Sequence, residues 1–493
     1  MNVMKNFYRL ILAATTMLAA ASCAENLETD SSETNVGNMV FSSVVDAAPV
    51  SKTTYSSQKV YWEAEDHITV FAVSDEILAS DFKVTKLSED KATATFEGVS
   101  DLDCETYYAV YPHSSTNAFD AQAGKLTVSL PAVQTAVPDG FESGSNVSVA
   151  CSDNVGGNQG SLQFRNVTTL VCLQFDSLDD AFNTKSITVR AKKNDGEYWG
   201  LAGTAQVQIG EDGIPVVGEG SETSVTLSAP ADGFKTDVIY YVPVYAVGAC
   251  TGLEVTFKAV NDNDYVKTND TAAELTRNWL FNIGAVPEPY PYADDLNIHI
   301  DFRQAAWPFV GDGPVSEQSS WTSGQTKSTI GEAYDYIFTD SNNFKRVLQF
   351  RIAQGKSSAS ITPDNYSWSQ ADGLKASTSG NTYNMVVMFP GIDDYYLTNV
   401  VVKQPAASST SNRLGLAIEG GSFSMSSIKG SGTVTFWLYE DMMVTDPSVT
   451  WDPENGKAAK GVPFFLRYRD KGYLYSLDLT YSKTSPGNAS AAE

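Results

Sequence analysis

The sequence predicts a nearly all-β protein built as three consecutive β-sandwiches. Short runs rich in Val, Thr, Tyr and Phe recur along the chain, and clusters of Gly, Asn, Asp and Pro separate them. Beyond the N-terminal segment, no window of a dozen residues carries apolar side chains at helical spacing, "SDEILASDF" at 74–82 being the nearest. The mature chain of about 470 residues corresponds to roughly three domains by length.

The N-terminus predicts export and a lipid anchor. Lys5 and Arg9 precede an apolar run from Leu10 to Ala21 that is too short for a permanent membrane helix, which is typical of a secretory signal. The small residues of "AAASC" resemble the bacterial lipobox, at which Cys23 is diacylated and becomes the new N-terminus. The alternative is an ordinary signal peptide with an incidental cysteine. We expect 1–23 to be a lipoprotein signal peptide, with the lipid on Cys23 holding the protein at the outer membrane, on the cell surface.

Composition excludes several classes of partner. Residues 24–37 are acidic and polar and lack aromatic side chains, so we expect a disordered tether. The chain carries 59 acidic and 33 basic residues, a net charge of -26, which repels nucleic acid and anionic head groups. The four later cysteines are too sparse for a disulfide scaffold. We expect buried thiols, with a single bridge as the alternative, at Cys104, Cys151, Cys172 and Cys250.

The stretch "EAEDH" at 63–67 is a candidate metal or acid–base site, because three carboxylates and an imidazole lie side by side. Apolar residues alternate directly after it, from Ile68 to Val73, as expected for a strand. We therefore interpret "EAED" as the turn of a hairpin. Its carboxylates should be hydrated, without the burial that raises the pKa of a general acid.

Searches for catalytic and metal-binding patterns find none. The three histidines, His67, His113 and His299, are far apart in sequence, and each is expected to be a surface or strand residue. There is no G-x-S-x-G, P-loop or dinucleotide motif. A glycosidase needs only two carboxylates, which spacing cannot exclude, but 59 acids supply such pairs by chance. We predict no enzymatic activity, no metal and no cofactor, and we interpret "NDND" at 261–264 and "DPENGK" at 452–457 as turns rather than calcium sites.

Five stretches in order resemble a known family. Glu65-Asp66, with Lys52-Thr53-Thr54 and Trp62-Glu63 ahead of it, is followed by "ATATFEG" at 92–98, "YYAVYP" at 107–112, "LPAVQ" at 130–134 and "LQFRNVTTLVCLQF" at 162–175. Together they resemble the fimbrillin-like surface lipoproteins of the Bacteroidetes, which include pilins and pilus accessory subunits. The resemblance covers about residues 38–290. It implies two consecutive transthyretin-like β-sandwiches, at 38–172 and 173–287.

The resemblance also implies a mode of assembly. In this family's pilins the first strand is removed by proteolysis, and a terminal strand of a neighbouring subunit fills the gap. The best-known route cuts after an arginine, but this chain has no Arg between Cys23 and Arg165. That departure favours an accessory, anchor or tip (adhesin) component of a pilus over a stalk subunit. Other pilus subunits are the expected partners, by strand exchange.

A change in composition marks a third domain. "GAVPEPYPYADD" at 284–295 holds three prolines, so we expect a stiff linker at 288–295. Beyond it we expect a β-sandwich at 296–483 and a flexible tail at 484–493. The closing "GYLYSLDLTY" at 472–481 resembles the final strand of galactose-binding-like jelly rolls, the fold of many carbohydrate-binding modules. The third domain is therefore the candidate module for contact with a host or microbial glycan or protein.

The positions of the tryptophans predict which residues of this domain contact a ligand. Five of the eight Trp residues lie here, and three of them, Trp307, Trp368 and Trp451, stand beside loop-forming polar residues. Trp437, in "TVTFWLYE", lies within a strand and is expected in the core. The candidates for stacking on a sugar ring and binding its hydroxyls are, in order, Trp368, Trp451, Trp307 and Trp321, with Asn365, Asp372 and Asp452. The alternative is that all five Trp fill the core.

Two functions remain open at this point. One is a pilus component that mediates cell adhesion. The other is a glycan-binding surface lipoprotein that uses the first two sandwiches as a stalk and feeds a polysaccharide uptake system.

Overall fold

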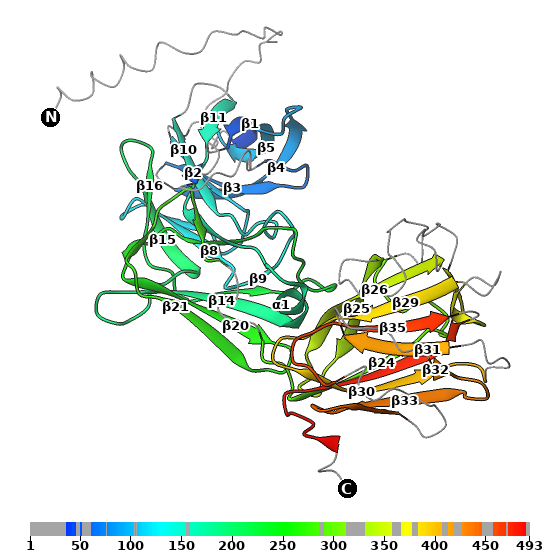
Figure 1. Cartoon of the computed structure of the whole chain (residues 1–493). Helices are drawn as coiled ribbons and strands as arrows, with labels where there is room; N and C mark the ends of the chain where they lie inside the picture. The colour runs from blue at the N-terminus through cyan, green and yellow to red at the C-terminus, as the bar shows by residue number, and fades with distance from the viewer. Residues whose placement is uncertain are drawn as a thin grey trace.

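The chain folds almost entirely into strands, which gather around three large hydrophobic cores in chain order (Figure 1). In the part that the structure describes, the one α-helix is α1 (Leu178–Asn183). The all-β sandwich prediction is confirmed. The structure is a computed structural model, and it describes residues 36–45, 50–51, 61–74, 76–102, 104, 106–153, 158–284, 290–311, 331–356, 366–376, 383–406, 413–418, 426–445, 457–469 and 472–489.

The first sandwich is an eight-stranded sheet curled around one core. Apolar side chains of alternate residues point inward, and Trp62 packs edge-on against Phe96 and Phe164 at its centre. The strand order is β11 (Gln159–Gln163), β1 (Val36–Val44), β5 (Thr93–Asp101), β4 (Ile77–Leu87), β3 (His67–Val73), β6 (Thr106–Tyr111), β10 (Ser148–Asp153) and β12 (Arg165–Asn166).

Strands β3 and β6 form a wall that the first two cores share. Val70 and Ala109 point into the first core, while Phe71 and Val110 point into the second. Because successive residues of a strand face opposite sides, a strand covered on both faces needs apolar side chains at nearly every position. This accounts for the uninterrupted burial of residues 68–72.

The second sandwich combines four small sheets. One is β18 (Tyr240–Tyr245), β13 (Thr168–Leu173), β23 (Trp279–Asn282) and β2 (Val50–Ser51), and another is β21 (Asp264–Asn269), β20 (Gly252–Ala259), β14 (Thr184–Lys192), β17 (Val225–Ser228) and β9 (Val133–Thr135). The others are β16 (Pro215–Val217), β15 (Gly203–Ile209), β8 (Lys125–Leu130) and β7 (Ala118–Asp120), and the pair β19 (Gly248–Cys250) and β22 (Ala273–Leu275).

The second sandwich includes two segments, 118–135 and 168–173, that the sequence-based boundary at residue 172 assigned wholly or mostly to the first. Strand β8 pairs with β15, and β9 pairs with β17. Strand β13 likewise pairs with β18 and β23. The cores therefore divide the chain differently from the sequence-based division at 172, because long-range pairing places 118–135 and 168–173 in the second core.

The third sandwich packs two antiparallel sheets face to face around the largest core. The first is β24 (Asp295–Asp301), β37 (Ser476–Ser482), β30 (Tyr396–Lys403), β33 (Thr433–Leu438) and β34 (Met443–Thr445). The second is β25 (Glu332–Thr339), β26 (Lys345–Lys356), β29 (Tyr383–Phe389), β35 (Phe464–Arg469), β31 (Arg413–Ile418) and β32 (Ser426–Ser427). A small sheet of β27 (Tyr366–Ser369), β28 (Gly373–Ala376) and β36 (Tyr473–Leu474) lies beside them.

A buried arginine joins the second and third sandwiches. The Arg346 guanidinium, fully buried, donates from Nε to Asp340 Oδ2 at 2.9 Å and from its terminal nitrogens to the carbonyl oxygens of Tyr290 (3.0 Å) and Pro291 (2.6 Å). Its carbon Cζ lies 3.8 Å from the ring centroid of Tyr292. The charge is thus paired and hydrogen-bonded, as a buried charge must be to be tolerated.

The predicted linker is part of this junction. Tyr290 and Ala293 are 1% and 3% exposed, so the chain from residue 290 onward is packed rather than a free extended connector. The linker expectation overlooked that a Pro-Tyr-rich stretch can supply both carbonyl acceptors and aromatic rings to a buried cation. Residues 288–289 lie outside the described residues.

Helix α1 completes the junction. Asp179 Oδ1 accepts a hydrogen bond from the backbone N–H of Val347 at 2.8 Å, and Asn183 exchanges two hydrogen bonds with the backbone of Lys345, at 2.6 and 2.7 Å. Sequence reasoning missed this helix. Its signal is the N-cap Ser177, whose hydroxyl accepts from the N–H of Asp180 at 3.1 Å, with acidic residues in the first turn.

We predict that Arg346→Met lowers the free energy of unfolding of the mature chain by about 3–5 kcal/mol, because Asp340 is left as a buried charge without its counter-charge. Urea denaturation followed by circular dichroism measures the loss. The matched control is Lys185→Met, which removes an exposed ion pair to Asp262 that water screens, and it should leave the free energy of unfolding nearly unchanged. Equal stability of Arg346→Met and the wild type would contradict this account of the junction.

Candidate binding surface

Two of the predicted stacking residues lie in one aromatic cluster. Trp368, on β27, and Trp307 pack edge-to-face with ring centroids 5.6 Å apart, and Trp307 also packs against Tyr334 at 5.3 Å. Both indoles are half-buried against the third core. The Trp368 indole N–H donates to the carbonyl of Phe302 at 2.7 Å. Their packing leaves less ring area for a ligand than a loop position implies, and their role in glycan contact stays a prediction.

The other predicted partners are only partly described. Asp372 lies at the β27–β28 turn, half-buried, and its carboxylate pairs with Lys375 Nζ at 3.0 Å. It is on the same small sheet as Trp368. Four predicted residues, together with the lipidation residue Cys23, lie outside the described residues: Trp321, Asn365, Trp451 and Asp452.

Trp437 corrects the sequence-based ranking. It was expected in the core because it lies within a strand, but its side chain is 40% exposed. Along β33, Val434, Phe436 and Leu438 are buried and Trp437 falls on the opposite, outer face. The period-2 alternation of a strand was the signal that could have found it. Among the described tryptophans, Trp437 is the one classed as an exposed large hydrophobic side chain.

The acidic turn holds a second correction. The turn itself is present at residues 64–65, and Glu63 and Glu65 are exposed as expected. Asp66, however, is only 7% exposed. Its carboxylate accepts hydrogen bonds from the backbone N–H of Glu63 at 2.7 Å and from the Tyr111 hydroxyl at 2.8 Å. Burial raises the pKa of Asp66 above its ordinary value, although both hydrogen bonds act against that shift.

Two histidines that are distant in sequence meet on the first sandwich. His67 Nδ1 lies 3.1 Å from Asp81 Oδ1, and His113 Nδ1 lies 3.9 Å from the same oxygen. The His113 ring nitrogen also hydrogen-bonds Thr69 Oγ1 at 2.9 Å. All three side chains are about one-third exposed. His299 stands apart, on β24 beside Asp478. The pairing of β3 with β4 creates this cluster, which spacing along the chain does not reveal.

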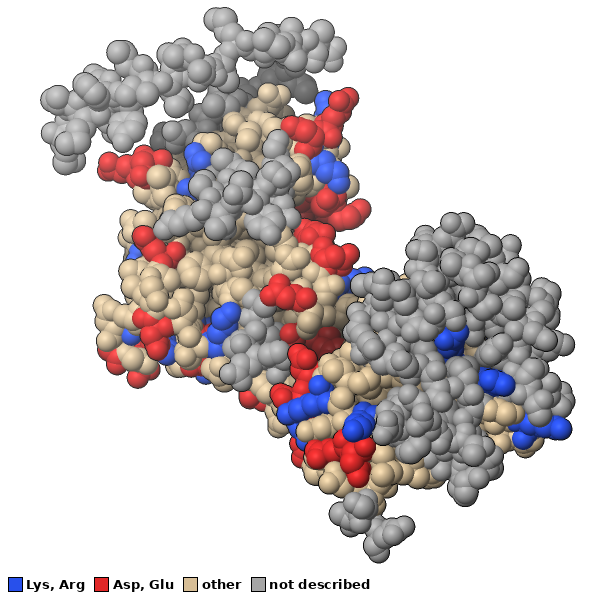
Figure 2. Space-filling view, in the orientation of Figure 1, with Lys and Arg blue, Asp and Glu red and all other residues tan. Residues whose placement is uncertain are grey.

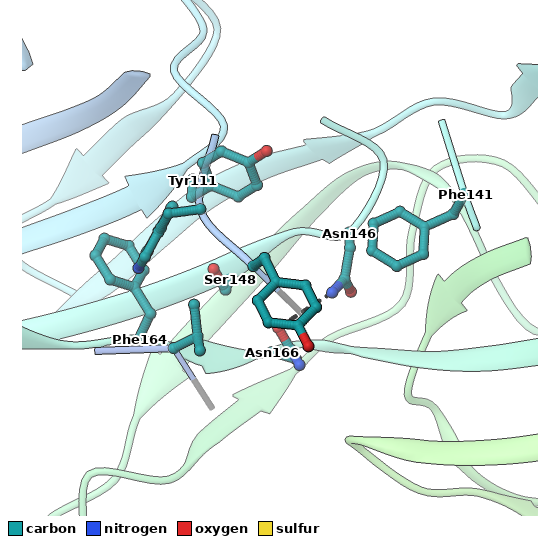
Figure 3. Close-up of a pocket in the computed structure, with 9 residues that line it drawn as sticks. Tyr111, Phe141, Asn146, Ser148, Phe164 and Asn166 are labelled. Atoms are coloured by element: carbon teal, nitrogen blue, oxygen red, sulfur yellow. Dashed lines mark hydrogen bonds between the residues drawn. The ribbon is translucent and has the colours of Figure 1, made fainter. Parts of the chain in front are cut away.

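A small pocket lies near the contact of the first two sandwiches (Figure 3). Figure 3 shows Tyr111 and Phe164 at one end and Phe141 at the other, with Ser148, Asn146 and Asn166 between them. The pocket offers about 40 Å³, enough for a few water molecules and too little for a sugar ring. The asparagines are engaged with each other and with Asn278, at 3.4 and 3.0 Å. The pocket is therefore no glycan site.

In the part of the chain that the structure describes, no disulfide joins Cys104, Cys151, Cys172 and Cys250. Cys104, Cys172 and Cys250 are buried as expected, and burial raises the pKa of Cys172 to about 11. Cys151 is exposed, so the expectation of a buried thiol is wrong there. Within the described ranges, no three His, Cys, Asp or Glu side chains are placed to hold a metal ion. None of the helices described has the length and apolar character to span a membrane.

Comparison with known proteins gives structural neighbours only. No family model and no curated protein matches this chain. Similar solved structures include a proposed cell adhesion protein of Bacteroides ovatus (13% identity, 52% of this chain and 94% of that chain, TM-score 0.33) and one of Bacteroides uniformis (14%, 51% and 93%, 0.31). A fimbrial assembly protein of Parabacteroides distasonis matches at 11% identity, with 63% and 98% covered and a TM-score of 0.28. These neighbours are structures that parts of this chain resemble at low identity, and none of their properties is carried over to it.

We predict that Asp66→Asn becomes more stable relative to the wild type as the pH rises from about 4 toward 7. The raised pKa means that the folded state holds its proton to higher pH than the unfolded state, so the stability contributed by Asp66 is lost as pH rises through its folded pKa. Asparagine stays neutral and can still bond Glu63 and Tyr111. Urea titrations across this range test it, with Glu65→Asn as the exposed control. A difference that does not change with pH, or that changes in the opposite direction, argues against a buried Asp66.

Proposed function

We propose that this chain is a fimbrillin-like surface lipoprotein that acts as an accessory, anchor or tip component of a pilus and contacts its adhesion target through the third sandwich. The resemblance of residues 38–290 and the lipoprotein signal support it, as does the placement of the third sandwich at the far end of the molecule from β1 (Figure 1). The lipid on Cys23 would hold the N-terminal end at the outer membrane.

The observation that carries this proposal is the first strand. Strand β1 lies between β5 and β11. It pairs with β5 in antiparallel orientation along all of Val36–Val44, and with β11 in parallel orientation. It contributes Met39 and Phe41, both completely buried, to the first core. A strand in this place fills the slot that strand exchange would otherwise open to a neighbour. Because no arginine lies between Cys23 and Arg165, β1 stays in its own slot, and such a subunit ends or anchors a pilus instead of extending it.

The charge distribution supports outward display of the third sandwich. Residues 24–295 carry 40 acidic and 15 basic residues, whereas 296–493 carry 19 and 16. Figure 2 shows acidic side chains spread over the first two sandwiches. Like charges repel, so the acidic body is poorly suited to contact anionic cell surfaces. The nearly neutral third sandwich can approach such a surface without this repulsion.

A specific observation also favours the second candidate, a glycan-binding lipoprotein of a polysaccharide uptake system. Trp437 is an exposed indole in the third sandwich, and indoles stack on the apolar face of sugar rings. The two functions differ in the partner of the first two sandwiches. A pilus component co-purifies with pilus subunits, and an uptake lipoprotein co-purifies with a transporter.

The state of β1 on cells tests the proposal. Intact bacteria are extracted without heating and run in SDS gels, and the N-terminus of the mature chain is sequenced. We expect the protein to retain residues 36–44 and to migrate mainly as a monomer or bound to other pilus subunits. A ladder of heat-labile multimers of this chain, with its N-terminus beyond residue 44, would identify a stalk subunit and refute the proposal.

Lipidation gives a separate prediction. Labelled palmitate should enter the wild-type protein and not Cys23→Ala, because Cys23 is the residue that the lipobox presents for acylation. The variant should also be lost from the outer-membrane fraction. Cys151→Ser, at an exposed thiol, is the matched control and should label normally. Equal labelling of Cys23→Ala and the wild type would exclude the anchor.

A further inference from the structure

The outer face of one sheet of the third sandwich carries an unusual row of side chains. Trp437 on β33 stands opposite Asn399 on β30, which stands opposite Thr480 on β37, which stands opposite Asn297 on β24. Neighbouring strands are spaced by about 4.8 Å, so the row spans about 14 Å across four strands, the length of a short oligosaccharide. A single exposed Trp is common on protein surfaces, but an indole in register with three polar groups is a patterned surface.

The backbone places Asn399 in this row. The pairing of β30 with β37 shifts register between Leu397 and Asn399, which is the signature of a β-bulge. Leu397 and Val400 point into the core on either side of it, so the extra residue brings both Thr398 and Asn399 toward the outer face. Bulges of this kind re-aim side chains and are over-represented beside functional sites.

The polar groups are held in place and still have hydrogen-bonding capacity. Asn399 Nδ2 donates to the carbonyl of Phe436 at 3.3 Å, and Thr480 Oγ1 donates to Asn297 Oδ1 at 3.2 Å. These bonds orient the amides and leave an amide oxygen on Asn399 and the amide hydrogens of Asn297 for a ligand. A row that offers both acceptors and donors suits hydroxyl groups, which do both.

The charge around the row selects among possible ligands. The row itself is uncharged. The carboxylates of Asp295, Asp301 and Asp478 lie on the same outer face, on β24 and β37. The basic side chains beside them among the described residues of these strands are Lys403 and His299, and His299 pairs with Asp478. A polymer bearing carboxylates or sulfates would meet like charges here, whereas an uncharged polymer would not.

We propose that the outer face of the β24-β37-β30-β33-β34 sheet binds an uncharged polysaccharide, with Trp437 stacking on a pyranose ring and Asn399, Thr480 and Asn297 binding hydroxyls of the rings that follow. This deepens the proposed function and rests on it, since it names the target that the third sandwich contacts. Val444, exposed and directly opposite Trp437 on β34, extends the apolar end of the row. The chemistry differs from that of a protein interface, which needs a larger apolar centre than one indole and one valine.

The test uses the mature chain, residues 24–493, in affinity gel electrophoresis. The uncharged probes are laminarin, galactomannan and xyloglucan, and the anionic probes are polygalacturonate and chondroitin sulfate. We expect at least one uncharged probe to retard the wild type and neither anionic probe to do so. Trp437→Ala should raise the Kd by about tenfold or more, as expected for a Trp anchor. Asn297→Ala should weaken binding less, and Tyr61→Ala, at an exposed aromatic of the first sandwich, should not change it.

Several results would overturn this inference: no retardation by the uncharged probes, retardation by the anionic probes alone, or full binding by Trp437→Ala with a circular dichroism melting curve like that of the wild type. Adhesion assays separate this failure from that of the proposed function. If deletion of the gene abolishes adhesion of the bacteria but Trp437→Ala leaves it intact, the target is not a glycan on this face, and the pilus role stands. If the deletion has no effect on adhesion either, the proposed function fails as well.

Discussion

The placement of the third sandwich depends on one buried cation. Arg346 binds an acid of its own sandwich, Asp340, and two backbone carbonyls of the segment that enters it, and it lies 3.7 Å from the Asp179 carboxylate of the second sandwich. The connection therefore cannot swing without breaking hydrogen bonds to a buried cation. Asp179 and Asn183 of α1 add backbone hydrogen bonds from the second sandwich. An adhesive surface gains from such a junction, because a rigid carrier presents its binding face at lower entropic cost than a flexible one.

The first two sandwiches are also fixed to each other. They share the wall of β3 and β6, so neither core is complete without the other. Strand β1 then closes the first core with its own side chains. The three features together describe an acidic support that ends in a nearly neutral sandwich, which is the arrangement that the proposed surface-display role requires.

Local sequence patterns predicted the fold class, but the burial and the partners of individual side chains depend on long-range strand pairing. Period-2 alternation and turn residues are local, so the strands and the turn at 64–65 could be predicted. The burial of Asp66 depends on Tyr111, 45 residues later, and the two carbonyl partners of Arg346 lie 56 and 55 residues earlier, so no short window of sequence reveals either. Trp437 is a different case. Its outward position follows from the alternation of Val434, Phe436 and Leu438, but the general tendency of Trp to be buried was given more weight.

The most direct test of the account is the accessibility of position 437 on living cells. Trp437→Cys is introduced into a Cys151→Ser background, and intact bacteria are treated with a membrane-impermeant maleimide. We expect rapid labelling of position 437, because the third sandwich is displayed outward and Trp437 lies on the exposed outer face of its sheet. Absence of labelling on intact cells, with normal labelling after lysis, would contradict it.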